Sequence, residues 1–501
     1  MKKILLYLLP LSVILVTGCK KEYLDTKPSN GVPQSSILST YGSITAALNG
    51  AYNEQFASGT GASTGHDNFG QKAFDLQLDL MGNDMVVHSQ GYGWFNTDYQ
   101  LTAWQSAATG QQSDNAWYMY YDLIKQANTI LANIDGIKDA TQSQKDAMKG
   151  EAYGMRAYCY YYLINLFQQT VKGNETKPGV PLYLDPSSLA DLGRGTVADV
   201  YTQINKDLSA ASTLLNGKTP VSKMNMSYKV VQGFIARVKL QQQDYPAAAT
   251  AAGNALVGYT LMSGAALNAR TAFSTASNSE FMWGSIIPEN LATIYASFFS
   301  HMDAITRQTY AQLGTQKKIT KDLFDQIPST DVRKKWWTAP GSPNISTNNP
   351  VYNQVKYTLP TNTGWAADYE YMTVAEMYLI QAEALARQGG KDAQAVTVLE
   401  TLIKTRNPAY SATGLTGTNL INEILLQRRI ELWGAGFGLL DIKRLGQGLN
   451  RPTGPGNHGA PNFNPGVYTT SPQDWRFLMR IPQRELDNNS KMTPADQNPA
   501  S

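Results

Sequence analysis

Apolar positions recur with the spacing of an α-helix in three stretches of the first half of the chain. In residues 113–134, side chains such as Trp117, Tyr120 and Ile124 fall on one face, three or four positions apart. Similar stripes run through residues 143–168 and 195–215, and Thr196 stands where a helix N-cap is expected. The pattern predicts three long amphipathic helices.

Two later stretches repeat each other. Residues 230–257 and 376–403 align without a gap, and each reads as an apolar stripe, a short polar turn and a second apolar stripe. Ala236 aligns with Ala382, and small side chains at such positions let two helices approach closely. We predict a helix–turn–helix pair of the tetratricopeptide kind in each stretch, with both alanines buried where the helices cross. Two unrelated helical hairpins are the simpler alternative.

The amino-acid composition changes between these helices. Residues 57–112, 258–368 and 446–501 are rich in Gly, Asn, Pro, Ser and Thr but keep their aromatic residues. They are too long for simple connections, so either a function or a separate sub-domain is expected. The pattern predicts a mainly α fold with loop-rich, irregular segments.

The N-terminus has the pattern of an export signal. Two lysines are followed by 13 mostly apolar residues, 4–16, too few for a membrane span of about 20 residues. The sequence Val-Thr-Gly-Cys at 16–19 resembles a bacterial lipobox, in which the cysteine thiol accepts a lipid. We expect a lipoprotein signal peptide at 1–18, lipidation of Cys19, and a polar tether over 19–35, so that the chain is held on a membrane by its lipid anchor. An ordinary exported protein with a chance cysteine is the alternative.

Composition excludes several classes of protein. The net charge is +3 with only 16% charged residues, which does not favour nucleic-acid binding. Lipidation of Cys19 would leave Cys159 alone, so no intrachain disulfide is expected, and its aromatic surroundings predict a buried, inert thiol. The four histidines lack metal-ligand spacing, and no GxSxG occurs, so neither a metal nor a cofactor is expected. Asp79 and Asp84 could serve a glycosidase, but 39 acidic residues offer many such pairs.

The C-terminal third carries the most diagnostic motifs. The run "ILLQRRIELWGAGFGLLDIKRLGQGLNR" at 424–451 resembles the signature of the RagB/SusD family of outer-membrane nutrient-binding lipoproteins. Residues 373–385, 476–499 and 150–185 are similar to further motifs of that family, in the same order. At four positions the chain departs from the usual family residue. Family members usually carry Glu where this chain has Gln427 and Ala435, and Arg where it has Gly438 and Thr373. We interpret the family charges as internal ion pairs whose two members have been lost together.

The resemblance implies a fold class, a function and partners. The fold class is mainly α, a tetratricopeptide-like helical scaffold with a loop-rich, irregular ligand-binding sub-domain. The resemblance further implies a protein without enzymatic activity, anchored at the outer membrane and facing the cell exterior. It would bind an oligosaccharide or polysaccharide and deliver it to a SusC-like TonB-dependent transporter. Peptide capture in the same role is one alternative. A secreted glycoside hydrolase and a helical-repeat scaffold without a small ligand are the others.

The resemblance also places the ligand site. The chain divides into an N-terminal helical region, 36–257, with an aromatic loop at 57–112, an irregular insert, 258–368, and a C-terminal region, 369–501. In the resembled family the N-terminal loop and the insert supply the ligand site. Aromatic rings stack on the C–H faces of sugars while polar side chains bond the hydroxyls. The candidates are Tyr92, Trp94, Tyr99, Asp67, Asn68 and Asn96 in the loop, and Trp283, Tyr295, Trp336 and Trp337 in the insert. Alternatively, several of these rings form the core of the sub-domain, as we expect for Tyr120 and Tyr158 of the helices.

Overall fold

The structure is a computed structural model that describes residues 38–61, 63–105, 111–186, 188, 190–306 and 308–500. The expected signal peptide at 1–18, the lipidated Cys19 and the tether over 19–35 lie outside these ranges. Across the described ranges, no helix combines the length and apolarity needed to cross a bilayer.

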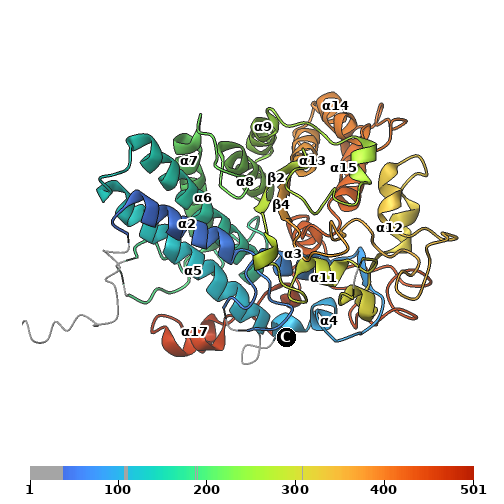
Figure 1. Ribbon diagram of the computed structural model, residues 1–501, viewed down its shortest axis with the longest axis horizontal. Helices are drawn as coiled ribbons and strands as arrows, with labels where there is room; N and C mark the ends of the chain where they lie inside the picture. The colour runs from blue at the N-terminus through green and yellow to red at the C-terminus, as the bar shows by residue number, and fades with distance from the viewer. Residues whose placement is uncertain are drawn as a thin grey trace, which may run out of the picture.

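The first half of the chain forms a bundle of long helices, α2 (Tyr41–Glu54), α5 (Gln111–Asn133), α6 (Gln142–Phe167) and α7 (Val197–Leu215), with α5, α6 and α7 packed side by side (Figure 1). The three predicted helices are thereby confirmed. Thr196 caps α7, accepting the N–H of Asp199 while its own N–H and hydroxyl bond the Asp199 carboxylate. Tyr120 and Tyr158 are fully buried, and both hydroxyls donate to the side-chain oxygen of Gln71. Cys159 is buried as well, and burial raises the pKa of its thiol.

The two repeated stretches form adjacent helix pairs. The first pair is α8 (Tyr228–Gln241) with α9 (Tyr245–Leu256), and the second is α13 (Val374–Ala386) with α14 (Asp392–Ile403). Helix α9 packs against both α8 and α13, so the pairs continue one row although the whole insert separates them in sequence (Figure 1). Ala236 and Ala382 are both 0% exposed, which confirms their predicted burial. The row continues into α15 (Gly417–Glu431), which packs on α13, and α16 (Gly438–Arg444) follows it along the chain.

Two small antiparallel sheets fasten the insert to the scaffold. Strand β2 (Phe281–Ser285) pairs with β4 (Tyr369–Thr373), and β4 leads directly into α13. Strand β1 (Met85–Val87) pairs with β3 (Lys317–Ile319), with Met85 opposite Ile319. The second pairing joins the N-terminal loop to the insert.

The remaining elements are short, as the loop-rich composition predicted. The α-helices among them are α3 (Gln71–Leu80), α4 (Asn96–Tyr99), α10 (Gly264–Leu267), α11 (Phe298–Met302), α12 (Lys321–Asp325) and α17 (Gln483–Asn488). The single turns of 3₁₀ or π type are η2 (Ala103–Gln105), η3 (Ile134–Gly136), η4 (Glu289–Leu291), η5 (Ala311–Thr315), η6 (Val332–Trp336), η7 (Trp475–Phe477) and η8 (Pro494–Asp496).

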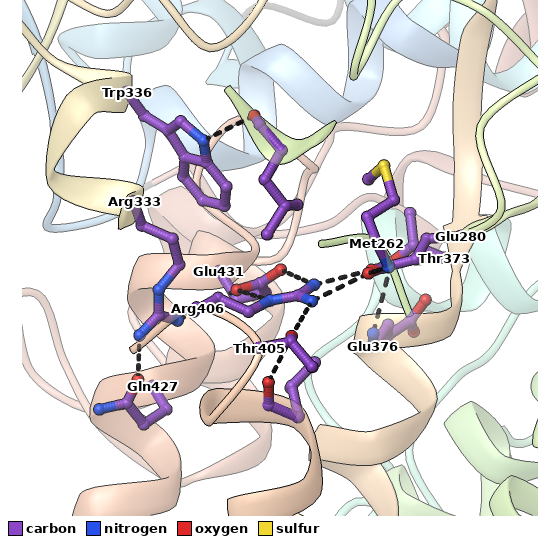
Figure 2. Close-up of polar contacts among 12 residues, drawn as sticks. Met262, Glu280, Arg333, Trp336, Thr373, Glu376, Thr405, Arg406, Gln427 and Glu431 are labelled. Atoms are coloured by element: carbon purple, nitrogen blue, oxygen red, sulfur yellow. Dashed lines mark hydrogen bonds and ion pairs between the residues drawn. The ribbon is translucent and has the colours of Figure 1, made fainter. Parts of the chain in front are cut away.

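A buried network of charges joins the insert to the C-terminal helices (Figure 2). Arg406, just beyond α14, donates to Glu280, the residue before β2, and to Glu431 of α15, with N–O distances of 2.7 Å to each. Arg333 of η6 pairs with Asp331 at 2.7 Å and with Glu431 at 3.0 Å. Because these side chains come from four separate segments, the network fixes how the insert sits on the scaffold.

Gln427 takes part in the same network as a neutral member. Its side-chain oxygen accepts a hydrogen bond from Arg333 (Figure 2). The ammonium of Lys356 donates to the backbone carbonyl of Glu431 at 2.8 Å. The Gln427 amide donates to the Glu423 carboxylate at 2.8 Å, so a glutamate at position 427 would place a second carboxylate beside that of Glu423. The loss of the four family charges as compensated pairs stays a prediction.

Candidate functional site

The N-terminal loop and the insert meet next to α4 and α11, near the lower edge of Figure 1. The Phe95 ring, at the start of α4, packs edge-on against the His301 ring of α11, with centroids 4.9 Å apart. Together with the β1–β3 pairing, this contact holds the two segments against each other. Several aromatic rings gather at the junction.

Six side chains form what we call the aromatic cluster: His66, Tyr92, Trp94, Tyr295, Tyr310 and Trp365. The His66 ring centroid lies 5.4 Å from that of Trp94 and 6.0 Å from that of Tyr295. The His66 plane makes angles of 27° with Trp94 and 15° with Tyr295, so both of these rings stack on His66. Tyr92 packs edge-on against Tyr310 at 5.3 Å, and Trp365 extends the cluster beyond Tyr295 at 6.4 Å.

The cluster is open to solvent. Tyr92 is 67% exposed and Tyr295 is 38% exposed, whereas a ring in the hydrophobic core would be covered by its neighbours. His66, Trp94 and Trp365 are half-buried. Only Tyr310 is buried, at 7% exposed, and it supports the rings around it. The open rings can therefore meet a ligand on one side and pack on the protein with the other.

Backbone turns explain why the loop rings point outward. Gly91 and Gly93 have φ of 50° and 87°, and a Cβ on Gly91 would lie 2.2 Å from a methyl of Thr315 in the insert. Phe95 has φ of 62°, an uncommon value for a residue other than glycine. Its ring is 1% exposed, so this turn buries Phe95 and leaves Tyr92 and Trp94 on the outer side. Unfavourable backbone of this kind is concentrated at functional sites.

Hydrogen bonds orient the centre of the cluster. The Tyr310 hydroxyl lies 2.6 Å from Nδ1 of His66, and His301 donates from Nε2 to the His66 carbonyl at 2.8 Å. Burial lowers the pKa of His301 to about 3, with the charge of Lys317 acting in the same direction, so the ring is neutral at pH 7. The Tyr310 hydroxyl and the neutral His301 ring thus fix the position of His66 in the cluster.

The structure brings together three of the expected ring candidates, Tyr92, Trp94 and Tyr295. It buries the three expected polar candidates beneath the loop, with Asp67 8%, Asn68 1% and Asn96 5% exposed. Asn68 donates to the carbonyls of Thr60 and Ser63, both at 2.6 Å. Asp67 accepts from Gln112 at 2.8 Å, and Asn96 donates to the Gln90 carbonyl at 3.0 Å. This corrects the expectation that these side chains face a ligand, because their hydrogen bonds shape the loop.

Tyr99, Trp283, Trp336 and Trp337 also need correction, because all four rings lie in the core, with exposed fractions of 0–2%. The Tyr99 hydroxyl bonds His458 at 2.7 Å, and the Trp283 indole donates to the Met224 carbonyl at 2.8 Å. Trp336 donates to the Leu267 carbonyl at 3.2 Å. Burial of Tyr99, Trp283 and Trp336 costs little because their polar atoms find partners inside the protein, whereas the buried Trp337 indole nitrogen has no hydrogen-bond partner among the described residues.

Sequence reasoning missed His66, Tyr310 and Trp365. His66 lies in the glycine-rich part of the loop and Tyr310 lies 244 residues away, so no spacing along the chain relates them. The signal that was available, aromatic residues within the two irregular segments, pointed to Tyr92, Trp94 and Tyr295 but not to the other three side chains of the cluster.

Two clefts lie outside the aromatic cluster, and each has a volume of ≈ 780 Å³. One runs between α15 and α16 and includes Trp433, which is 4% exposed. The other lies in the insert and includes Trp337, which is 2% exposed. Neither of these indoles offers a face for stacking. Within the described ranges, no three His, Cys, Asp or Glu side chains gather as metal ligands would.

Both the sequence and the fold of the chain are similar to those of known proteins. The family model described as "Starch-binding associating with outer membrane" matches residues 22–240, and the model described as "SusD family" matches residues 298–500. SusD-like protein P2 of Formosa agariphila is 24% identical, and the alignment covers 97% of this chain and 98% of the relative.

Solved structures agree with this assignment of the fold. A SusD-like carbohydrate binding protein from Bacteroides vulgatus superposes with a TM-score of 0.80 at 24% identity, covering 92% of this chain and 98% of its own. Surface glycan-binding protein A from Bacteroides thetaiotaomicron, in complex with laminarihexaose, superposes with a TM-score of 0.69 at 16% identity, covering 91% and 98%. The two family matches, over residues 22–240 and 298–500, together span most of the chain and show that the chain belongs to the SusD/RagB family.

Proposed function

We propose that the chain binds an oligosaccharide or polysaccharide on the aromatic cluster and delivers it to a SusC-like TonB-dependent transporter. The observation that carries the proposal is the partly exposed set of rings in which Trp94 and Tyr295 both stack on His66. Pyranose rings have flat C–H faces that pack on such planes. The laminarihexaose complex of a protein with the same fold supports a glycan as the ligand.

The acidic groups next to the rings support binding without hydrolysis. A glycoside hydrolase needs two carboxyl groups that flank the scissile bond. Asp67 is buried and accepts from Gln112, and Glu289 accepts the backbone N–H groups of Trp365 and Ala366 at 2.8 and 3.1 Å. Both carboxylates are therefore engaged in shaping the site. Incubation with a glycan that binds should release no reducing sugar, and steady release would contradict this part of the proposal.

The direct test removes one ring of the cluster. Trp94→Ala should weaken binding by about 1–3 kcal/mol, roughly 5- to 150-fold in Kd, by analogy with the stacking of nucleic-acid bases on aromatic side chains. Titration calorimetry with a panel of neutral glycans, beginning with laminarin oligosaccharides, measures the loss, and a thermal melt of the same variant measures stability. Trp475→Ala is the matched control, because Trp475 is also half-buried but lies over Arg476, 4.7 Å from its guanidinium.

Two results would count against this site. A large fall in melting temperature with unchanged affinity would place Trp94 in the core. Binding of extended peptides, with no glycan bound, would favour the peptide alternative for the same surface.

The anchor is a separate part of the proposal. Cys19 is proposed to carry the lipid that holds the chain at the outer membrane, facing the cell exterior. Cys19→Ala should release the protein from the membrane fraction, since no other thiol lies near the proposed cleavage site. If the variant partitions with membranes as the native protein does, the proposal that Cys19 carries a lipid anchor is wrong.

A further inference from the structure

The cleft of the insert, which Trp337 lines, begins close to the aromatic cluster. Its volume of ≈ 780 Å³ lies within the range of about 300–1,000 Å³ that is usual for ligand sites. Three segments of the insert supply its lining, within residues 304–312, 329–339 and 342–355. The first of these segments also carries Tyr310 of the cluster.

Two stretches of backbone lead from the cluster to the cleft. The His301 ring of α11 stacks on the Tyr310 ring at 5.2 Å, and Ala304 and Ile305, which follow α11, line the cleft. Tyr310 is the residue before η5, and Gln312 of η5 lines the cleft. Two residues of backbone span at most about 7 Å, so the cleft begins within one turn of the cluster.

The turn η5 is held in place, and side chains on and beside it are open to solvent. The Ser89 hydroxyl donates to the Gly314 carbonyl. The Leu313 N–H donates to the Thr309 carbonyl at 3.0 Å. The Leu313 side chain is 43% exposed, and that of Ile305, which lines the cleft, is 48% exposed. A ligand that leaves the cluster can therefore cross η5 over apolar side chains without displacing the turn.

Three side-chain amides in the cleft are free to bond a ligand. Gln312, Asn344 and Asn348 line it, and within the described part of the chain none of these amides makes a hydrogen bond. Gln312 is half-buried, and the two asparagines are exposed. An amide donates through its NH₂ group and accepts through its oxygen, so it can bond a sugar hydroxyl in either direction.

The loop that carries the two asparagines is held by a buried neighbour. The Asn349 amide donates to the Asn344 carbonyl at 3.0 Å, and its oxygen accepts from the Thr338 hydroxyl at 2.8 Å. Gln316 donates to the Asn348 carbonyl at 3.3 Å. Because the backbone is bonded while the side chains of Asn344 and Asn348 are not, the loop presents both amides with little ordering left to do on binding.

The wall of the cleft also contains an unsatisfied donor. The Nε1 atom of Trp337 is buried, and it has no partner among the described residues. A buried polar group of this kind indicates a bound water or ligand group. The Trp337 ring itself packs edge-on against Trp336 and Trp433, at 6.0 and 5.9 Å. The cleft therefore offers hydrogen bonds, whereas the aromatic cluster offers faces for stacking.

We propose that this cleft is a second subsite for the glycan. One chain would stack on the aromatic cluster, cross η5 and accept and donate hydrogen bonds at Gln312, Asn344 and Asn348. Sugars have apolar ring faces and hydroxyl edges, so the two subsites together satisfy both. The inference rests on the proposed function and narrows its ligand to a chain of several sugar units, because the ligand must contact the cluster and the cleft at the same time.

The dependence of affinity on chain length tests the second subsite. Titration calorimetry compares laminaribiose with laminarihexaose, or the disaccharide and hexasaccharide of whichever glycan in the panel binds. The native chain should prefer the hexasaccharide. The double variant Gln312→Ala/Asn344→Ala should reduce that preference by about 5- to 100-fold, at roughly 2- to 10-fold in Kd for each hydrogen bond lost.

A matched control uses the other cleft of equal volume. Asn422 is exposed on α15 and lines the cleft between α15 and α16, so Asn422→Ala should keep the native preference for the longer chain. If Asn422→Ala reduces this preference as much as the double variant does, the assignment to the cleft of the insert is refuted.

The outcomes also separate this inference from the proposed function. If glycans bind and Trp94→Ala weakens them, but the double variant keeps the native preference, only the second subsite is refuted. If no glycan of either length binds, the proposed function fails and the second subsite with it. Crystals of the native chain soaked in the hexasaccharide should show one chain from Trp94 across Leu313 to Asn344. A chain confined to the cluster would overturn the inference, even if the double variant does not fold.

Discussion

Replacing Arg406 by methionine tests whether the buried network holds the insert on the scaffold (Figure 2). Arg406 is fully buried and bonds Glu280 and Glu431, each through both carboxylate oxygens. Its loss would leave two buried carboxylates short of a cation. Breaking a buried ion pair in this way costs about 3–5 kcal/mol. For a chain of this length, with an unfolding entropy of about 2.1 cal/mol/K per residue, the melting temperature should fall by roughly 3–5 °C.

The pH dependence of the same variant identifies the cause. Burial raises the pKa of Glu431, but Arg406 and Arg333 outweigh it and lower the pKa to about 2. A lowered carboxyl pKa stabilises the folded state above the unfolded value of about 4.3, and this contribution is lost as the pH falls towards 2. Since Arg406→Met removes part of this contribution, its deficit should be full at pH 7 and clearly smaller at pH 3.

Two further variants complete the experiment, with melts followed by circular dichroism or calorimetry. Glu280→Gln added to Arg406→Met should recover part of the loss, because one buried charge is removed. Lys404→Met is the matched control, since Lys404 is two residues away and pairs with Glu400 while 49% of its side chain is exposed, so little change is expected. If Arg406→Met melts within 1 °C of the native chain, or if Lys404→Met costs as much, the reasoning fails.

Two further predictions concern packing and a buried acid. Ala382→Leu should overpack the helix crossing and lower stability by about 1–3 kcal/mol, and an unchanged melting temperature would contradict the close approach of α13 to its neighbours. Asp98 is fully buried, and burial together with the charge of Asp67 raises its pKa to about 8. A raised carboxyl pKa favours the folded state below the unfolded value of about 3.9, and this stability is lost as the pH rises to about 8. Asp98→Asn should therefore raise the melting temperature more at pH 8 than at pH 5, and an equal change at both pH values would contradict it.

The sequence alone determined the helices, the repeat and the family. The stripes of α5, α6 and α7 and the cap at Thr196 follow from neighbours three or four positions apart, so local spacing is sufficient to identify them. The burial of Ala236 and Ala382 could be predicted for the same reason, because the paired stretches repeat residue by residue. The family motifs are likewise contiguous runs, and each can be recognised without knowing what lies against it.

Only the tertiary structure decided which rings are free to meet a ligand. Trp94 and Trp283 both stand beside glycine in the sequence, yet Trp94 is half-buried while Trp283 is fully buried against Tyr158 and Phe234. That difference depends on which helix covers each ring, and no local pattern carries this information. The same holds for His66 and Tyr310, which become partners only because the β1–β3 pairing brings the loop to the insert. Exposure is a property of long-range packing, so the sequence could name both segments of the candidate site and three of its rings, but could not separate these rings from the candidates that are buried.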